Sequence, residues 1–250
     1  MIDTILKHRS IRNYKSTAIT DEVLSEILNA AIRASNTGNM QLYSIIVTKD
    51  EKKKKQLWES HFKQDMVNQA PVVLTFVADI NRFHKWCKLR NAGEAYDNFL
   101  WFYNATIDAT IAAQNASVAA EENGLGICYL GTTTYMAQNI INILELPKGV
   151  VPVTSIVVGY PNEEPPLTDR LPFEAVVFDE KYPDLSDSEI NELFKEKEES
   201  DFTKALIEEN QTENLAQIFT QKRYKKSDNL HFSKEFLKIL ENQGFMNNEG

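Results

Sequence analysis

Thirty consecutive residues, 94–123, contain neither proline nor glycine and are rich in alanine, isoleucine and aromatic residues, so they predict one long helix. At ~1.5 Å per residue the helix would extend about 45 Å, whereas a compact domain of this size has a radius of gyration of only ~18 Å. Within it, "ATIDATIAAQNASVAA" carries small residues on nearly every face, which predicts burial all round. The centre of one domain or a subunit interface would provide that burial, and we favour the interface.

Four other stretches predict strands. Residues 42–49 and 71–79 are apolar and β-branched, which is typical of buried strands. Residues 124–131 predict a short strand bounded by glycines, and residues 150–161 predict a further strand that ends at a glycine and a proline.

Helical patterns alternate with these strands, at 20–31, 50–69, 134–145, 184–210 and 228–243. The second pattern reads as a surface helix, whose lysine run we interpret as a solvated face rather than a binding patch. The fourth is acidic, and the fifth is an amphipathic helix that Gly244 ends. Interleaved helices and strands predict one α+β or α/β domain, with the part past residue 183 as a peripheral arm.

Composition excludes several classes of partner. The 250 residues carry a formal net charge of −9, which argues against nucleic acid as a main partner. No apolar run approaches the ~18 residues that span a bilayer, and the start lacks a signal-peptide core, so we expect no membrane partner. Two cysteines, Cys87 and Cys128, are too few for a disulfide framework and are not spaced as metal ligands. We therefore expect a cytoplasmic protein without a metal.

The basic residues of this acidic chain gather at its start, in "KHRSIRNYKS". Arg9, Ser10 and Arg12 offer two planar guanidiniums and a hydroxyl, a set that suits a phosphate. Taken alone, a solvated surface explains such residues better.

Two later stretches carry polar groups beside the predicted core. Asn36, Thr37, Gly38 and Asn39 lie in "RASNTGNMQLYS", whose amides and hydroxyls suit a heteroaromatic edge, although a helix-capping turn explains them equally well. Arg170 in "PLTDRLP" is held between prolines, where a lone arginine is usually a surface residue.

Taken together, these stretches resemble the nitroreductase family of FMN-dependent enzymes. The similarity covers residues 1 to about 182 and follows the family's order through "HRSIRNY", "ASNTGNMQ", "QAPVVLTFVADINR", "GLGICYLGTT" and "LTDRLP". Among its members, the chain is most similar to the NADPH-preferring group of oxygen-insensitive nitroreductases and flavin reductases.

The resemblance implies a three-layer α/β/α sandwich of the α+β class. Its sheet would be mixed and mainly antiparallel, with a long central helix and a C-terminal extension. We expect an FMN-binding core over 1–182 and a helical arm of the same domain over 183–250. A homodimer is also implied, with FMN near its interface.

The resemblance also implies cofactor-binding residues. The phosphate and ribityl end of FMN would contact His8, Arg9, Ser10 and Arg12, with Arg170 closing on the phosphate. The loop at Asn36, Thr37, Gly38 and Asn39 would border the isoalloxazine, and Gln69 would approach its polar edge. The ring would be covered by Tyr129, Leu130 and Gly131.

The implied activity is oxidoreduction by NAD(P)H through FMN in a ping-pong order, with nitroaromatics, quinones or free flavins as acceptors. The cofactor carries the chemistry, so no catalytic residue is assigned. A non-catalytic flavin-binding redox sensor or store would need the same residues, and a same-fold enzyme with different flavin chemistry is a further alternative.

Two departures and one basic run bear on specificity. The related group often has a lysine where this chain has Thr168, and a second glycine where it has Thr132. The NADPH 2′-phosphate would meet basic residues of the C-terminal part, for which we name Lys222, Arg223 and Lys225. A solvated linker that balances the acidic segment is the alternative for this run.

Overall fold

Four strands form one sheet in the order β1-β2-β4-β3, and all neighbouring strands in it are antiparallel. They are β1 (Tyr43–Thr48), β2 (Val72–Asp79), β3 (Gly126–Tyr129) and β4 (Val150–Gly159). Each falls inside a predicted stretch, so the four strand predictions are confirmed. β2 is buried along its whole length, as its unbroken apolar sequence indicated.

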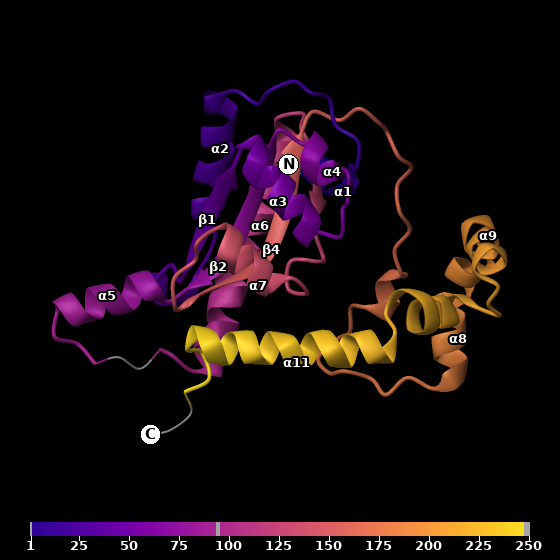
Figure 1. Ribbon diagram of the computed structural model, residues 1–250. Helices are drawn as coiled ribbons and strands as arrows, with labels where there is room; N and C mark the ends of the chain where they lie inside the picture. The colour runs from indigo at the N-terminus through magenta and orange to yellow at the C-terminus, as the bar shows by residue number, and fades with distance from the viewer. Residues whose placement is uncertain (1, 94–95, 248–250) are drawn as a thin grey trace. The chain divides into compact units, whose positions relative to one another are not determined.

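The computed structural model describes residues 2–93 and 96–247. It contains two compact units, one of Met1–Leu167 with Glu235–Gly250 and one of Thr168–Lys234. The sheet belongs to the first unit (Figure 1).

The register between β2 and β4 shifts between Phe76 and Val77, because Val77 lies opposite Pro152 whereas Phe76 lies opposite Thr154. The one extra residue in β4 forms a bulge. Proline has no N–H for the ladder, and a bulge lets a central strand accommodate it.

One face of the sheet is covered by α2 (Asp21–Ile32) and α6 (Phe99–Glu122). Leu74 and Phe76 of β2 point to this face and belong to one buried cluster with both helices. Thr20 caps α2, since its side chain accepts a hydrogen bond from the Val23 N–H, and the predicted helix start is confirmed.

The opposite face is covered by α3 (Glu51–Ser60), α4 (Met66–Gln69) and α7 (Ala137–Ile143). Val73 and Val157 alternate with the residues of the first face and pack into this second cluster. Helices therefore lie on both sides of the sheet, and the predicted three-layer α+β sandwich is confirmed.

α6 is the predicted long helix, but it begins at Phe99 rather than at residue 94. Asn98 starts it by accepting a hydrogen bond from the Trp101 N–H, and residues 94–95 lie outside the described part of the chain. Small side chains fill its contacts with α2 and the sheet. Six of its alanines are completely buried: Ala105, Ala109, Ala112, Ala113, Ala116 and Ala120.

The prediction of one surface helix over 50–69 is wrong, because the structure has two helices there with a turn between them. α3 ends at Ser60, and Phe62 and Lys63 then adopt left-handed conformations, with φ of 54° and 58°, before α4 begins. The sequence carries no glycine or proline there, so no local signal marked the turn.

The interpretation of the lysine run as a fully solvated face is also wrong, because Lys54 is buried. Its Nζ donates to the Ala70 carbonyl at 2.9 Å and pairs with Glu51 at 2.8 Å. A long side chain can bury its stem only if its charged end is satisfied, and the last turn of α4 satisfies it here.

His61 follows α3 and is completely buried. Its Nδ1 lies 2.7 Å from Oγ1 of Thr132, in the connection between β3 and α7. Burial lowers the pKa of His61 to about 4. The ring is therefore neutral near pH 7.

The first unit also contains short helical segments, and its C-terminal part belongs to the last helix. They are α1 (Ile2–Leu6), η1 (Thr37–Asn39) and α5 (Asn81–Leu89), and the last helix is α11 (Lys226–Gln243), of which the part from Glu235 belongs to this unit. α11 stops before Gly244, whose φ of 82° favours glycine, as predicted.

The second unit contains η2 (Phe173–Ala175), α8 (Asp187–Glu199), α9 (Asp201–Asn210), α10 (Leu215–Gln217) and η3 (Ile218–Arg223). The acidic stretch 184–210 thus forms two helices. Ser186 starts α8 with a capping box, and the Ser200 side chain starts α9. That residues 183–250 form an arm of the same domain stays a prediction.

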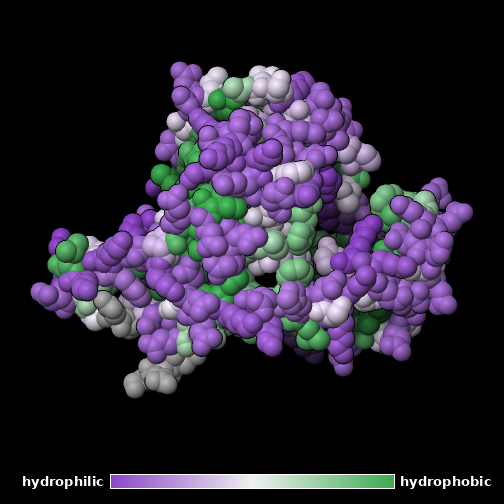
Figure 2. Space-filling view, viewed as in Figure 1, coloured by the Kyte–Doolittle hydropathy of each residue, from purple (hydrophilic) through white to green (hydrophobic). Residues whose placement is uncertain are grey.

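The surface in view is mainly hydrophilic, with separate apolar patches (Figure 2). Within the described residues, no helix has both the length and the apolar character that crossing a bilayer requires.

We expect Gly126→Ala to weaken the contact between β3 and the N-terminal segment. A Cβ at this position would lie 2.5 Å from Cγ1 of Ile11, so the two segments would have to separate. The free energy of unfolding, measured with urea, should fall by about 1–3 kcal/mol. Gly93→Ala is the control, since nothing lies within 4 Å of its Cβ position. Equal stability of both variants would contradict the close approach.

We expect His61 to make the protein less stable as the pH falls from 7 to 4. The unfolded chain binds a proton at His61 below pH 6.5, whereas the folded chain does so only near pH 4. Acidification through this window therefore favours unfolding, by about 3 kcal/mol from this residue at pH 4. Urea unfolding of the wild type and of His61→Asn at several pH values measures the difference. Parallel pH profiles for the two proteins would refute the assignment.

Candidate functional site

The basic segment at the start of the chain lies along β3, the edge strand of the sheet. Ser10 forms a parallel bridge with Ile127, and the Ile11 N–H donates to the Ile127 carbonyl at 2.9 Å. Side chains of an extended segment alternate in direction. The segment therefore presents two sets of side chains, His8, Ser10 and Arg12 on one side and Arg9 and Ile11 on the other.

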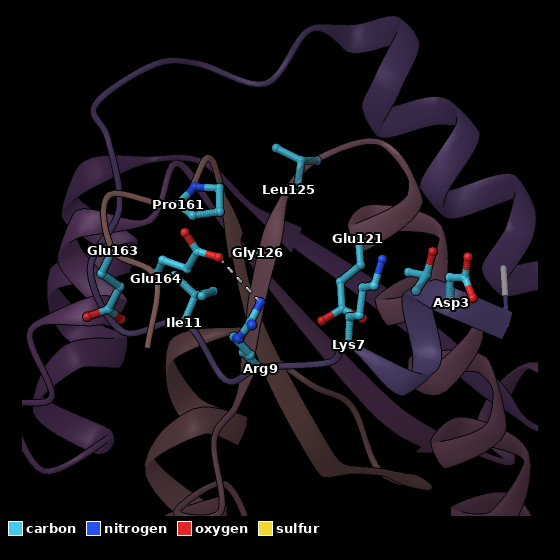
Figure 3. Close-up of a pocket in the computed structure, with 11 residues that line it drawn as sticks. Asp3, Lys7, Arg9, Ile11, Glu121, Leu125, Gly126, Pro161, Glu163 and Glu164 are labelled. Carbon is cyan, nitrogen blue, oxygen red and sulfur yellow. Dashed lines mark ion pairs between the residues drawn. The ribbon is translucent and has the colours of Figure 1, made fainter. Parts of the chain in front are cut away.

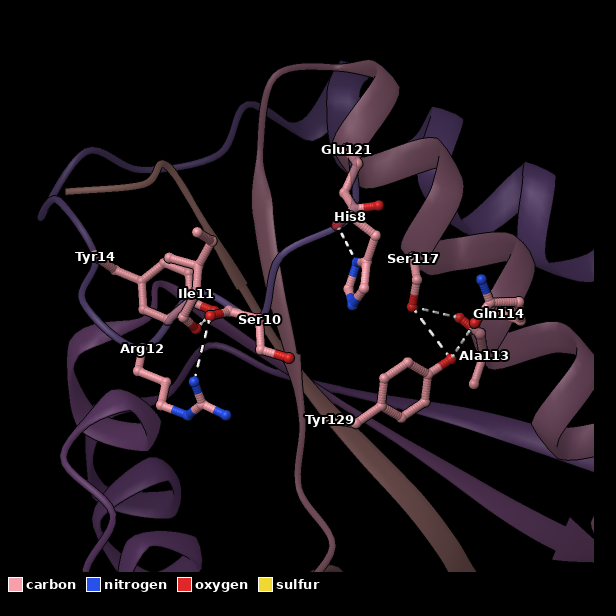
Figure 4. A network of polar contacts seen from close by, with 10 residues as sticks. All are labelled: His8, Ser10, Ile11, Arg12, Tyr14, Ala113, Gln114, Ser117, Glu121 and Tyr129. Atoms are coloured by element: carbon pink, nitrogen blue, oxygen red, sulfur yellow. Dashed lines mark hydrogen bonds and ion pairs between the residues drawn. The ribbon is translucent and has the colours of Figure 1, made fainter. Parts of the chain in front are cut away.

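The first set lies near the end of β3 (Figure 4). His8 Nδ1 is 2.6 Å from the Glu121 carboxylate, and Arg12 donates to the Ser10 carbonyl at 3.5 Å. Burial raises the pKa of Cys128, although Arg12 and a hydrogen bond with Ser10 act in the opposite direction. Ser10 and Arg12 are therefore close to the Cys128 thiol, which stays protonated near neutral pH.

Tyr129 is the last residue of β3, and its ring is tied to α6 (Figure 4). Its hydroxyl lies 3.2 Å from Ser117 Oγ and donates to Gln114 Oε1 at 3.3 Å. Burial raises its pKa, so the hydroxyl keeps its proton. These contacts fix the Tyr129 ring in place on the side of the segment that carries His8, Ser10 and Arg12.

The second set opens onto a cavity of about 470 Å³ (Figure 3). Arg9 Nη1 lies 3.8 Å from Glu164, and Glu121, Glu163 and Lys7 also line the cavity. Arg9 Nε is buried and has no partner among the described residues. An unpaired buried donor is costly, so this guanidinium suits a further anion.

Glu163 binds the backbone of the same segment. The Arg12 and Asn13 N–H groups both donate to its Oε1, at 2.5 and 3.0 Å. These two contacts fix the backbone where the Arg12 side chain leaves it.

The predicted loop at 36–39 is held against the other part of α6. The backbone N–H and Oγ1 of Thr37 donate to Asp108 Oδ1 at 2.8 and 3.0 Å. Asn36 accepts from the Gln41 N–H at 3.2 Å, and Gly38 and Asn39 have left-handed φ values of 56° and 55°. Asp108 is buried, and its Oδ2 has no partner in the described chain.

The structure does not bring this loop to the basic segment within one chain. The loop contacts α6 at Asp108, whereas His8 contacts it at Glu121, 13 positions later. At 1.5 Å per residue the two contact points are about 20 Å apart along the helix. The predicted residues of the loop and of the basic segment therefore meet α6 at two different places.

The other residues predicted for the ring lie in two places. Leu130 and Gly131 follow Tyr129 directly, and the Leu130 N–H donates to the Ser155 carbonyl at 2.8 Å. Gln69 ends α4 and lines a different cavity, beside Lys54, rather than the one that holds Arg9.

The remaining predicted residues belong to the second unit. Arg170 donates to the carbonyls of Thr168 and Asp169 at 3.2 and 2.9 Å. Lys222, Arg223 and Lys225 are exposed, at the end of η3 and just after it.

Sequence reasoning missed the acidic partners of the site, Glu121 and Asp108, and also His61. One signal was present, because Gln114, Ser117 and Glu121 recur at helical spacing in a stretch of small apolar residues. The Thr37 contact of Asp108 and the Thr132 contact of His61 each join residues 71 positions apart, and no local pattern marks them.

Comparison with known proteins gives the family. The model of the Nitroreductase family matches residues 5–160. The FMN reductase (NADPH) of Bacillus subtilis (strain 168) is 35% identical over 183 residues, which cover 72% of this chain and 74% of the relative.

Solved structures share the fold over the whole chain. A protein of Bacteroides fragilis NCTC 9343 is 49% identical with a TM-score of 0.96, over 98% of this chain and 100% of its own. The NADPH:FMN oxidoreductase from Vibrio harveyi, complexed with NAD+, is 27% identical with a TM-score of 0.83, over 99% of each chain. The fold, the order of the motifs and these similarities show that the chain belongs to the nitroreductase family.

Proposed function

We propose that this protein is an FMN-dependent oxidoreductase that uses NAD(P)H, with NADPH preferred, to reduce nitroaromatics, quinones or free flavins. The observation that carries the proposal is the arrangement of the segment at 8–12 along β3. It places a hydroxyl and a guanidinium beside a fixed tyrosine ring, in a chain that is otherwise acidic. The names of two relatives, FMN reductase (NADPH) and NADPH:FMN oxidoreductase, support the same activity.

The donors at the segment fit the phosphate of FMN. A guanidinium has five N–H donors, and the one hydrogen bond of the Arg12 side chain within the described chain is 3.5 Å long. Ser10 adds a hydroxyl on the same side, and the unpaired Nε of Arg9 belongs to the opposite side of the segment. We infer that His8, Ser10 and Arg12 hold the phosphate and ribityl end, whereas the roles of Arg9 and Arg170 stay predictions.

FMN, when bound, supplies the hydride chemistry. The chain binds and orients the ring, for which Tyr129 is a wall held by α6 and Leu130 and Gly131 continue the cover. The positive charge of Arg12 would stabilise the negative charge that the flavin gains on reduction, and the protein would not need to rearrange for it. We expect ping-pong order, in which the oxidised nicotinamide leaves before the electron acceptor takes its place.

We propose a homodimer in which α6 lies at the interface. A stripe of large apolar side chains on α6 is exposed at helical spacing, at Phe99, Tyr103, Ile107 and Ile111. A second copy would cover this stripe and bring its own loop at 36–39 to the basic segment of the first. Sedimentation at micromolar concentration should give twice the chain mass, and a monomer that keeps FMN would contradict the proposal. A cytoplasmic location stays a prediction.

The first expected outcome concerns Arg12. Arg12→Ala should weaken FMN binding about ten- to a hundredfold, because a charge-assisted hydrogen bond contributes roughly 1.5–3 kcal/mol. Titration of flavin fluorescence measures the dissociation constant. Arg90→Ala is the control, since this exposed side chain donates to the neighbouring Leu89 carbonyl. Unchanged affinity in Arg12→Ala would remove the phosphate assignment.

The same preparation tests the activity. NADPH added without oxygen should bleach the flavin absorption, and a quinone should restore it over many cycles. A bound flavin that NADPH does not reduce would point instead to a redox sensor or store.

The second expected outcome concerns the coenzyme. NADPH differs from NADH by a 2′-phosphate, and the basic run in the second unit offers exposed cations for it. Replacing Lys222 and Arg223 by alanine should raise KM for NADPH about tenfold or more and leave KM for NADH unchanged.

Steady-state kinetics with both coenzymes measures the effect. Lys195→Ala with Lys204→Ala removes the same charge elsewhere in the second unit and should change neither value. Equal losses for NADPH and NADH would show that the basic run is structural.

A further inference from the structure

Thr132 directly follows Leu130 and Gly131, which are proposed to cover the flavin ring. Its side chain is held by a residue from another part of the chain. His61, completely buried after α3, places Nδ1 2.7 Å from Thr132 Oγ1. The turn itself is closed, because the N–H and Oγ1 of Thr133 both donate to the Leu130 carbonyl, at 3.2 and 2.8 Å. The position of Thr132 is thus fixed by both its backbone and its side chain.

A second side chain reaches the same oxygen. Gln64 Nε2 lies 3.4 Å from Thr132 Oγ1 and donates to the His61 carbonyl at 3.0 Å. A carbonyl accepts only from the amide nitrogen, so this contact fixes which end of the Gln64 amide faces Thr132. The left-handed Phe62 and Lys63 turn the chain so that His61 and Gln64 both face this oxygen.

The neutral His61 ring carries one N–H, and its place can be assigned. His61 Nε2 is buried and has no partner in the described chain. A buried N–H without a partner is rarer than a buried acceptor without one. The proton therefore belongs on Nδ1, which donates to Thr132.

Thr132 Oγ1 then accepts two hydrogen bonds, from His61 and from Gln64. A hydroxyl oxygen has two acceptor positions and one hydrogen, so the hydrogen remains as a donor. Within the described residues no acceptor for it lies within hydrogen-bond distance. Thr132 is only half-buried, so part of the residue faces solvent.

We propose that Thr132 is a hydrogen-bond donor of the active site, aimed by His61 and Gln64 as positioning residues, toward an acceptor atom of the flavin ring or of the oxidising substrate. This rests on the proposed function, because it takes the turn after β3 as the cover of the ring. A glycine at this position would allow the turn but would lack the hydroxyl donor. The hydroxyl therefore adds specificity for molecules that carry a hydrogen-bond acceptor.

Thr132→Val tests the donor, since valine keeps the shape and removes the hydroxyl. Thr134→Val is the matched control in the same connection. If the acceptor is on the flavin, Thr132→Val should raise the FMN dissociation constant about two- to tenfold and shift the midpoint potential, both without substrate. If it is on the substrate, both values stay as in the wild type, and kcat/KM for 1,4-benzoquinone falls by a similar factor. No change in any of the three quantities would overturn the proposal.

Variants of His61 test the positioning role. His61→Leu should reproduce the change seen in Thr132→Val, and His61→Asn, which keeps a donor nitrogen, should restore most of the loss. The double variant His61→Leu with Thr132→Val should be no worse than Thr132→Val alone in the affected quantity, because the two residues act through one hydroxyl. Additive losses would overturn the role of His61.

Gln64→Leu gives the same test at a half-buried position if His61→Leu does not fold. It should move the affected quantity in the same direction as Thr132→Val, and an unchanged value would overturn the role of Gln64. Wild-type protein that fails to bind FMN or to be reduced by NADPH would contradict the proposed function itself. That outcome is distinct from every variant outcome.

Discussion

The contact between the N-terminal segment and β3 is the constraint on which the site depends. Ser10 and Ile11 can pair with Ile127 only because Gly126 has no side chain where Ile11 packs. A strand pairing fixes the direction of every side chain along it, so one bridge decides that Ser10 and Arg12 share a side and that Arg9 faces away. Residue types alone suggested a phosphate site, but the pairing divides its basic groups between two surfaces.

α6 carries the polar residues that hold the other parts in place. Its buried face is made of alanines, which let the sheet and α2 approach, and single polar side chains interrupt that face. Glu121 holds His8, Ser117 and Gln114 hold Tyr129, and Asp108 holds Thr37. Asp108 and Ser117 are buried, whereas Glu121 is half-buried and Gln114 is exposed. A buried polar group is costly unless it is hydrogen-bonded, so the contacts of Asp108 and Ser117 favour one position of their partners. One helix thus orders two surfaces that lie about 20 Å apart along it.

The sequence predicted what local patterns encode. Apolar runs indicated all four strands, because a run of apolar side chains favours burial. The stretch without proline or glycine indicated α6, because no residue in it breaks a helix. The turn at Phe62 was not predictable, since no glycine marks its left-handed backbone. Lys54 also looked solvated, because its partner is the carbonyl of Ala70, which lies 16 positions away, just after α4. The contacts of His61 and Glu121 likewise depend on the assembled sheet.

Four titratable groups of the first unit, Tyr14, His61, Cys128 and Tyr129, share one property that bears on the chemistry. Burial raises the pKa of Tyr14, Cys128 and Tyr129, so all three keep their protons near neutral pH. Burial lowers the pKa of His61 to about 4, so this ring gains none. Such groups do not exchange protons with a substrate at pH 7, but they hold fixed hydrogen-bond directions. A site of this kind positions a reactive partner and leaves the electron transfer to it, which is what a cofactor-dependent reaction requires of a protein.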